Sequence, residues 1–210
     1  MAVLETKEVF YSYAKENNIL SDVNALFETG RMYAILGPSG SGKTTLLSLL
    51  GGLDSPTKGE ILFNGENIAG RGLEYHRRHH VSLIFQSYNL IDYMTPVENV
   101  NLTAQQDALP VLKRLGLSAE EAKRNVLKLS GGQQQRVAIA RTLASGAPFI
   151  LADEPTGNLD EDTAAEITGI LKESAYELDK CVIVVTHSSE LAKQADIVLK
   201  LKRGKLLSVR

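Results

Sequence analysis

The sequence predicts an α/β fold built on a mostly parallel, buried sheet. Short apolar runs rich in β-branched residues alternate with stretches of helical periodicity, which is the pattern of a sheet covered by helices. These runs extend for about five residues, far short of the ~20 that a membrane-spanning helix needs. The length of 210 residues and the hydrophobic share of 43% fit one globular domain with a sizeable core.

Five apolar runs are the predicted strands of this sheet. They are Met32–Leu36, Val81–Phe85, Phe149–Ala152, Val182–Thr186 and Ile197–Leu201. The last run leads through a turn at Lys202–Lys205 into a further short strand, and we expect the basic residues of this hairpin to be solvated.

Two other regions have a different character. The first thirty residues and Glu60–Phe63 are extended, with expected turns at Gly30, Gly59 and Gly65. Between Val97 and Lys128 the apolar spacing becomes helical, most clearly in LPVLKRLGL. The sequence therefore predicts extended structure before the first parallel strand and a helical region between two of the later parallel strands.

Composition and termini limit the function classes. A net charge of −2 gives no electrostatic indication of nucleic-acid binding. The single cysteine, Cys181, has no partner for an internal disulfide, and its position in CVIVV predicts a buried structural thiol in a reducing compartment. The opening residues lack the basic stretch and long apolar core of a signal peptide. We expect a cytosolic chain that reaches a membrane only through a partner.

A glycine-rich loop follows the first predicted strand and precedes the helical run TTLLSLL, which is the context of a phosphate-binding P-loop. Glycines let the backbone curl so that several N–H groups point at phosphate oxygens. In this motif the lysine reaches the β- and γ-phosphates and the next hydroxyl ligates Mg²⁺. The predicted nucleotide-binding residues are Gly37, Pro38, Ser39, Gly40, Ser41, Gly42, Lys43, Thr44 and Thr45.

A second candidate anion site is the motif LSGGQ at Leu129, Ser130, Gly131, Gly132 and Gln133, just before the helical run QQQRVAIARTLAS. Its Ser-Gly-Gly turn at a helix N-terminus suits anion binding. The alternative is an ordinary capped helix start. That alternative leaves unexplained why one chain with one P-loop carries a second phosphate-type turn.

Polar side chains are expected at the carboxyl edge of the sheet. Asp153 and Glu154 end the run FILADE, where Asp153 suits Mg²⁺ binding and Glu154 suits a general base for an attacking water. An ordinary strand-end turn before Pro155 is the alternative. Gln86 and His187 follow two other strands, and ligands of open α/β folds bind at this edge.

Together these residues resemble the nucleotide-binding domain of ABC transporters over essentially the whole chain. The resemblance implies a P-loop NTPase core, an antiparallel β subdomain on the N-terminal side and a short helical subdomain at about 88–135, within one domain spanning 1–210. It also implies a Walker A motif at Gly37–Thr45, a Q-loop at Gln86, a signature at Leu129–Gln133, a Walker B motif at Phe149–Glu154, a D-loop at Asn158–Asp160 and a switch histidine at His187.

The resemblance further implies residue roles and cofactors. ATP and Mg²⁺ are the expected cofactors, with Thr44, Gln86 and Asp153 at the metal. Glu154, His187 and Gln86 are the expected catalytic residues. An aromatic residue usually stacks on adenine about thirty positions before the Walker lysine, which favours Tyr13 and leaves Tyr11 as the second choice.

In this family two copies pair head to tail, each signature closing on the nucleotide in the other P-loop, with Asp160 in the dimer D-loop. The resemblance thus implies an ATPase homodimer on the inner face of the cell membrane, driving a separate permease. GGLDSPTKGEILFNGENI, FQSYNLI and ADEPTGNLD look like the branch that serves lipoprotein release, cell division, and macrolide or peptide-antibiotic export and resistance. A non-transport ABC-type ATPase acting on a soluble or nucleic-acid partner is the alternative, although no nucleic-acid partner is expected. A non-catalytic module is disfavoured by Glu154 and His187.

Two features stand outside this pattern. Gln86 and Leu129 are 43 residues apart, which is short for the family and affects the region that contacts the membrane partner. The segment HRRHH carries His76, His79 and His80, and its arginines argue against a cation site. We expect a solvated basic edge there.

Overall fold

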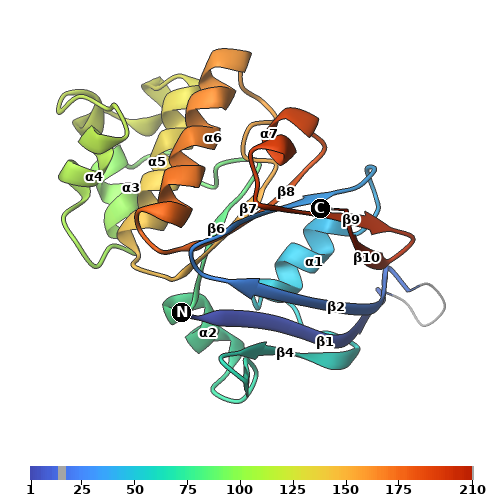
Figure 1. Ribbon diagram of the computed structural model, residues 1–210. Coiled ribbons are helices and arrows are strands. Elements are labelled where there is room, and N and C mark those ends of the chain that lie inside the picture. The colour runs from blue at the N-terminus through green and yellow to red at the C-terminus, as the bar shows by residue number, and fades with distance from the viewer. Residues whose placement is uncertain (14–17, 210) are drawn as a thin grey trace.

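The structure, a computed structural model, describes residues 1–13 and 18–209 and contains two sheets and a set of helices (Figure 1). The strands are β1 (Val3–Tyr11), β2 (Leu20–Glu28), β3 (Met32–Leu36), β4 (Lys58–Phe63), β5 (Glu66–Asn67), β6 (Val81–Ile84), β7 (Phe149–Asp153), β8 (Cys181–Thr186), β9 (Ile197–Lys202) and β10 (Lys205–Ser208). The α-helices are α1 (Lys43–Leu50), α2 (Leu73–His79), α3 (Pro96–Asn101), α4 (Ala108–Arg114), α5 (Gly131–Ala144), α6 (Glu161–Tyr176) and α7 (Ser189–Lys193).

The larger sheet confirms the predicted strands. Its order is β10-β9-β3-β8-β7-β6, with every neighbouring pair parallel except the terminal β9–β10 hairpin. Strand limits differ from the prediction by one residue; β6 ends at Ile84, so Gln86 lies in the turn beyond it. The hairpin turns at Arg203 and Gly204, both with positive φ, as a two-residue type I′ turn requires.

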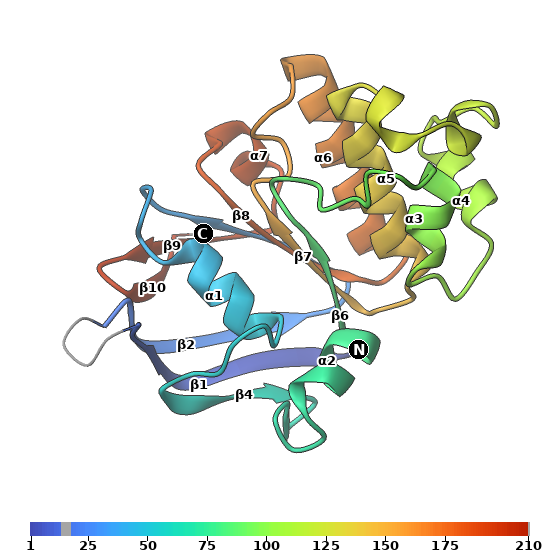
Figure 2. The ribbon, with the colours of Figure 1, turned by 180° about the vertical axis from the view of Figure 1, so that it is seen from behind.

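This sheet separates two hydrophobic cores because its side chains alternate between faces. On β3, Met32 and Ala34 join the core beneath α3–α6, whereas Tyr33 and Ile35 join the core shared with α1 and the smaller sheet. That smaller sheet, in the order β2-β1-β4-β5, is antiparallel and confirms the expected β subdomain (Figure 2).

The predicted helical stretch between β6 and the signature folds into short pieces rather than one long helix. Helix α3 begins with a capping box between Thr95 and Glu98, and α4 begins at the cap Asp107. Two single turns of 3₁₀ helix, Glu121–Lys123 and Val126–Lys128, then lead to the signature. Side-chain caps therefore stabilise ends that short helices cannot satisfy internally.

The expected turn at Gly59 is wrong. Gly59 lies inside β4, opposite an irregularity in β1 at Glu8, and has a φ of +81°. A Cβ atom there would stand 2.2 Å from the Glu8 carbonyl oxygen. Glycine is required because the two backbones approach this closely, whereas Gly30 and Gly65 lie in turns as expected.

The expected solvated edge at HRRHH is also wrong for two of its three histidines. His76 is fully buried, with its Nε2 2.9 Å from the Leu50 carbonyl oxygen and its Nδ1 3.1 Å from Nδ1 of His80. The His80 ring stacks on Phe63 at a centroid distance of 3.7 Å. Helical geometry causes the difference, since residues four apart share one face of α2 and that face packs inward.

Cys181 is fully buried in β8, as predicted, and burial raises the pKa of its thiol. Within residues 1–13 and 18–209, no helix has both the length and the apolar character needed to cross a bilayer.

Candidate functional site

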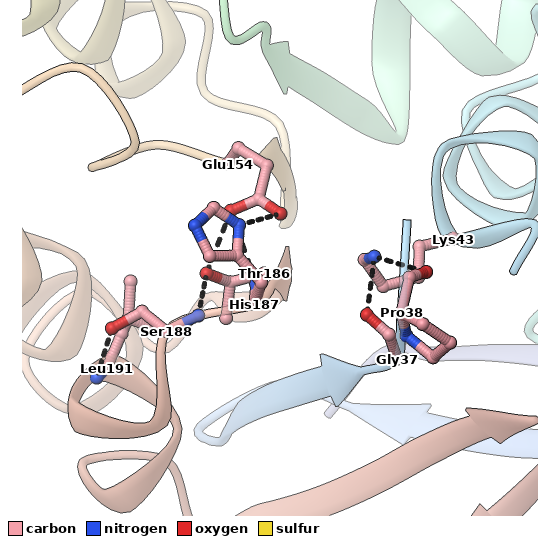
Figure 3. A network of polar contacts seen from close by, with 8 residues as sticks. All are labelled: Gly37, Pro38, Lys43, Glu154, Thr186, His187, Ser188 and Leu191. Carbon is pink, nitrogen blue, oxygen red and sulfur yellow. Dashed lines mark hydrogen bonds and ion pairs between the residues drawn. The ribbon is translucent and has the colours of Figure 1, made fainter. Parts of the chain in front are cut away.

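The carboxyl ends of β3, β7 and β8 bring the predicted P-loop, carboxylates and histidine to one edge of the sheet. These strands are adjacent and parallel, so residues that follow them gather together. Figure 3 shows Lys43 with Gly37 and Pro38 on one side, and Glu154 with Thr186 and His187 on the other.

The P-loop curls as its glycines predict. Gly40 and Gly42 have φ values of +75° and +96°, and a Cβ on Gly42 would lie 2.8 Å from the Ile19 side chain. Lys43 is largely buried, and its Nζ donates to the carbonyl oxygens of Gly37 at 2.8 Å and Pro38 at 3.3 Å. Helix α1 begins at Lys43, so its positive end and the ammonium group face the same loop.

Asp153 lies at the end of β7, beside the P-loop hydroxyl. Burial raises the pKa of this carboxyl above its usual value, and the charge of Glu154 acts in the same direction. A hydrogen bond from Thr44 and the charge of Lys43 oppose this shift. Thr44 and Asp153, which the sequence predicts at the metal, are therefore near enough for the Thr44 hydroxyl to affect the pKa of the Asp153 carboxyl.

Glu154 is held by three donors from the end of β8. Its Oε2 accepts from Thr186 Oγ1 at 2.9 Å and from the His187 backbone N–H at 3.3 Å. Its Oε1 accepts from His187 Nδ1 at 2.8 Å (Figure 3). Glu154 also has a φ of +44°, uncommon for a residue with a side chain. Sequence reasoning missed Thr186; its only signal was a hydroxyl at the end of an otherwise apolar strand.

The two candidate adenine-stacking residues differ in exposure. Tyr13 is 73% exposed and, with Ile19, lines a depression with Gly40, Gly42, Lys43, Thr44 and Thr45. Its hydroxyl lies 3.2 Å from Thr45 Oγ1. Tyr11 is 6% exposed, and its hydroxyl donates to Asp54. Of the two, Tyr13 is the ring that a ligand in the P-loop could reach.

Gln86 is exposed in the turn after β6, near the turn that follows Glu154. Its amide nitrogen is 3.8 Å from the position of a Cβ on Gly157. The backbone just beyond it is held by Arg141, which donates to the carbonyl oxygens of Tyr88 at 3.0 Å and Asn89 at 2.7 Å. Arg141 was not predicted; the signal was an arginine within the apolar run VAIARTLA of the helix that follows the signature.

The signature starts α5. Ser130 Oγ accepts from the Gln133 backbone N–H at 3.3 Å, and Gln133 Oε1 accepts from the Ser130 N–H at 3.0 Å, which together form a capping box. Leu129 is buried, and Gly131 and Gly132 form the first turn. Because α5 and α1 contribute to cores on opposite faces of the sheet, the signature and P-loop do not converge within one chain.

Asp160 is linked to the signature by a residue in the first turn of α6. Its carboxylate caps α6, accepting from the Thr163 N–H at 3.0 Å and the Thr163 hydroxyl at 2.8 Å, and these bonds lower the pKa of Asp160. A Cβ on Gly132 would lie 2.8 Å from the Thr163 side chain. Thr163 thus contacts both Asp160 and Gly132.

A separate groove of about 630 Å³ runs between the end of α2, strand β6 and the end of α5. Leu83, Phe85 and Leu102 contribute apolar surface to it, while Arg77 and Arg78 supply basic groups. Arg141, which holds the backbone after Gln86, is also part of its wall.

Comparison with known proteins bears out the resemblance. Residues 20–157 match the ABC transporter family. The chain is 45% identical to YclH of Bacillus subtilis, an uncharacterised ABC transporter ATP-binding protein, over 97% of this chain and 95% of that one. It is 41% identical to the macrolide export ATP-binding/permease protein MacB 2 of Aeromonas hydrophila over 94% of this chain, but it spans only 32% of that protein.

Solved structures agree. The fold matches the dimeric structure of MJ0796, a bacterial ABC transporter cassette, with a TM-score of 0.87, 37% identity and 99% coverage of both chains. A dimeric post-hydrolysis state of the same cassette bound to ADP and Pi gives a TM-score of 0.84 with 36% identity and 99% coverage of both chains. This chain therefore belongs to the ABC transporter family, as an ATP-binding subunit with the fold of its ATPase cassette.

Proposed function

We propose that this chain hydrolyses ATP to ADP and phosphate as a head-to-tail homodimer and thereby powers a separate export permease. The proposal rests on one observation: the P-loop, the Asp153–Glu154 pair and His187 all lie at the same edge of the sheet. Phosphate-binding, acid–base and switch groups from three separate strands meet there.

ATP is bound through its phosphates by the P-loop. The loop N–H groups and the N-terminus of α1 attract the anion, and Lys43 transfers its hydrogen bonds from Gly37 and Pro38 to phosphate oxygens. Tyr13 stacks on adenine, because it is the exposed aromatic ring beside the loop.

The oxygen atoms of Thr44 and Asp153 would hold Mg²⁺, which prefers hard oxygen ligands, and the amide oxygen of Gln86 would be a further ligand. The ion would neutralise charge on the β- and γ-phosphates. Thr44 is near enough to Asp153 to lower the pKa of its carboxyl, which supports this assignment.

Glu154 acts as the general base. As the water oxygen attacks the γ-phosphorus, a water proton passes to the Glu154 carboxylate and the bond from the γ-phosphorus to the ADP oxygen breaks. Thr186 and His187 hold the carboxylate before reaction. His187 then exchanges its contact with Glu154 for one with the γ-phosphate.

A second copy completes the site. Ser130, Gly131 and Gly132 present an anion-binding turn that lies on the opposite face of the sheet from the P-loop helix of the same chain. That turn is suited to the nucleotide of another chain, with Asp160 beside it at the dimer contact. The dimeric cassettes of MJ0796 support this arrangement.

The permease binds in the groove between α2, β6 and α5. Its apolar lining residues and its basic residues Arg77 and Arg78 suit a short permease helix with an acidic end. Contact there also reaches Arg141 and the backbone after Gln86, which links the permease to the ATP site. The chain then works at the inner face of the cell membrane and drives export of a peptide, lipoprotein or drug-like cargo. Relatives named for macrolide and pyoverdine export support the direction of transport.

The mechanism is tested with Glu154→Gln. This variant should bind ATP, lose about 10²–10⁴ in turnover and accumulate as an ATP-bound dimer, whereas Lys43→Ala should lose ATP binding. Glu60→Gln, at a half-buried carboxylate on β4, is the matched control and should keep full turnover. Normal turnover by Glu154→Gln would rule out its role as the base.

The transport assignment has its own test. Tagged Glu154→Gln protein is purified with ATP from detergent-solubilised native membranes, and the co-purifying proteins are identified. A polytopic membrane protein that is lost when Arg77 and Arg78 are changed to Glu supports the proposal. Recovery of soluble factors alone would overturn it while leaving the ATPase chemistry intact.

A further inference from the structure

The side chain of Tyr11 packs against the ring of Tyr13. The two rings meet edge to face, with centroids 5.1 Å apart and an interplanar angle of 90°. Such aromatic pairs favour this geometry because a positive ring edge meets a negative ring face. Tyr13 is exposed at the P-loop, whereas Tyr11 is buried at the end of β1.

The far end of Tyr11 is tied to the P-loop helix. Its hydroxyl donates to Asp54 Oδ2, and Asp54 Oδ1 accepts from the Ser55 backbone N–H at 2.7 Å. Asp54 follows shortly after α1, the helix that begins at Lys43. The hydrogen bond to Asp54, reinforced by burial, raises the pKa of Tyr11 to about 12, so the phenol remains a donor at neutral pH.

Tyr13 is therefore held at two points. Its ring packs edge to face with the Tyr11 ring, and its hydroxyl lies 3.2 Å from Thr45 Oγ1 in α1. A tyrosine this exposed would otherwise sample several rotamers, and a ligand would have to restrict them on binding. Restricting one such side chain in advance corresponds to a gain of about two- to tenfold in affinity.

We propose that Tyr11 and Asp54 are positioning residues for nucleobase recognition, fixing the Tyr13 ring beside the phosphate-binding loop. The inference rests on the proposed binding of ATP in the P-loop and adds which residues prepare the site for the base. It predicts that the pair contributes to the affinity for ATP but not to the affinity for a phosphate chain without a base.

The test compares two probes by isothermal titration calorimetry: ATP and inorganic tripolyphosphate. Tyr11→Phe keeps the ring and removes the hydroxyl, and Asp54→Ala removes the acceptor. Each should weaken ATP binding about two- to tenfold and leave tripolyphosphate binding unchanged. The double variant should be no weaker than either single one, because both break the same bond. Asp54→Asn, whose amide oxygen still accepts, should restore most of the affinity.

Three outcomes overturn the proposal. Unchanged ATP affinity in both single variants removes the positioning role. Equal weakening of ATP and tripolyphosphate binding shows that Asp54 acts on the P-loop helix itself. Additive losses in the double variant show that the two residues act separately. Failure of the wild-type chain to bind either probe would instead refute the proposed function, so the two failures are distinguishable.

Discussion

Acidification should destabilise this fold through His76, and the size of the effect follows from its surroundings. Burial lowers the pKa of His76 from 6.5 to about 4. The charges of His80 and Arg77 also lower this pKa, whereas the hydrogen bond to the Leu50 carbonyl raises it and partly offsets the shift. The unfolded chain therefore binds more protons than the folded chain between these two pH values. The stabilisation is complete above about pH 6.5 and is lost as the pH falls toward 4.

The magnitude can be worked out by linkage. The difference between the two pKa values corresponds to about 3 kcal/mol in total, of which about 2 kcal/mol is already lost between pH 7.5 and pH 5. The pKa of His80 is lowered too, mainly by burial, so His80 contributes in the same direction.

The assay is urea unfolding followed by circular dichroism at several pH values, comparing wild type with His76→Gln. Gln keeps a donor for the Leu50 carbonyl but does not titrate. The free energy of unfolding of the wild type, relative to this variant, should fall by about 2 kcal/mol from pH 7.5 to pH 5. Using the variant as the reference cancels the contribution of the carboxylates that titrate in both proteins.

His79→Gln is the matched control. It removes an imidazole from the same helix, but one that is exposed and keeps its contact with water in both states. This variant should show the wild-type dependence of stability on pH. If the free energy of unfolding depends on pH in the same way for wild type and His76→Gln, the reasoning is refuted, because protonating the buried His76 would then cost nothing.

Three further predictions concern other parts of the chain. In thermal melts, Gly59→Ala should lower the free energy of unfolding by about 3 kcal/mol, because its methyl group meets the backbone of β1. Gly65 has a similar φ but open space around it, so Gly65→Ala should lower the free energy of unfolding by only about 1 kcal/mol. Thr186→Val removes a hydroxyl that holds Glu154, so kcat for ATP should fall about tenfold with the Kd for ATP unchanged, and Thr186→Ser should recover it; an unchanged kcat would contradict this role. Arg141→Met frees the backbone after Gln86, so retention of the permease on the tagged chain should fall, and full retention would argue against this groove.

The parts of the site that could be predicted are those that form from consecutive residues. The P-loop curls because Gly40 and Gly42 adopt positive φ, and the signature caps its helix because Ser130 and Gln133 are three residues apart. The parallel strands follow from short apolar runs, and parallel strands necessarily gather their carboxyl ends at one edge. Each of these depends on local sequence and needs no knowledge of distant contacts.

Other features depend on which distant surfaces meet. HRRHH is polar in sequence, yet the tertiary structure buries His76 against the end of α1 and stacks His80 on Phe63. Gly59 reads as a turn residue, yet it is the only residue type that fits opposite Glu8. Spacing alone favoured Tyr13 and left Tyr11 as the second choice for stacking on adenine. The tertiary structure shows that Tyr11 is buried in the core and that Tyr13 is exposed at the surface.

The sequence by itself therefore determined the α/β class, the positions of the parallel strands along the chain and most of the groups that meet at the sheet edge. It did so because backbone conformation, helix capping and strand periodicity act over a few residues. Only the tertiary structure decided that Thr186 and His187 hold Glu154, that Arg141 holds the backbone after Gln86 and that the P-loop and signature helices face opposite cores. These contacts join residues tens of positions apart, and their partners are chosen by packing rather than by local preference.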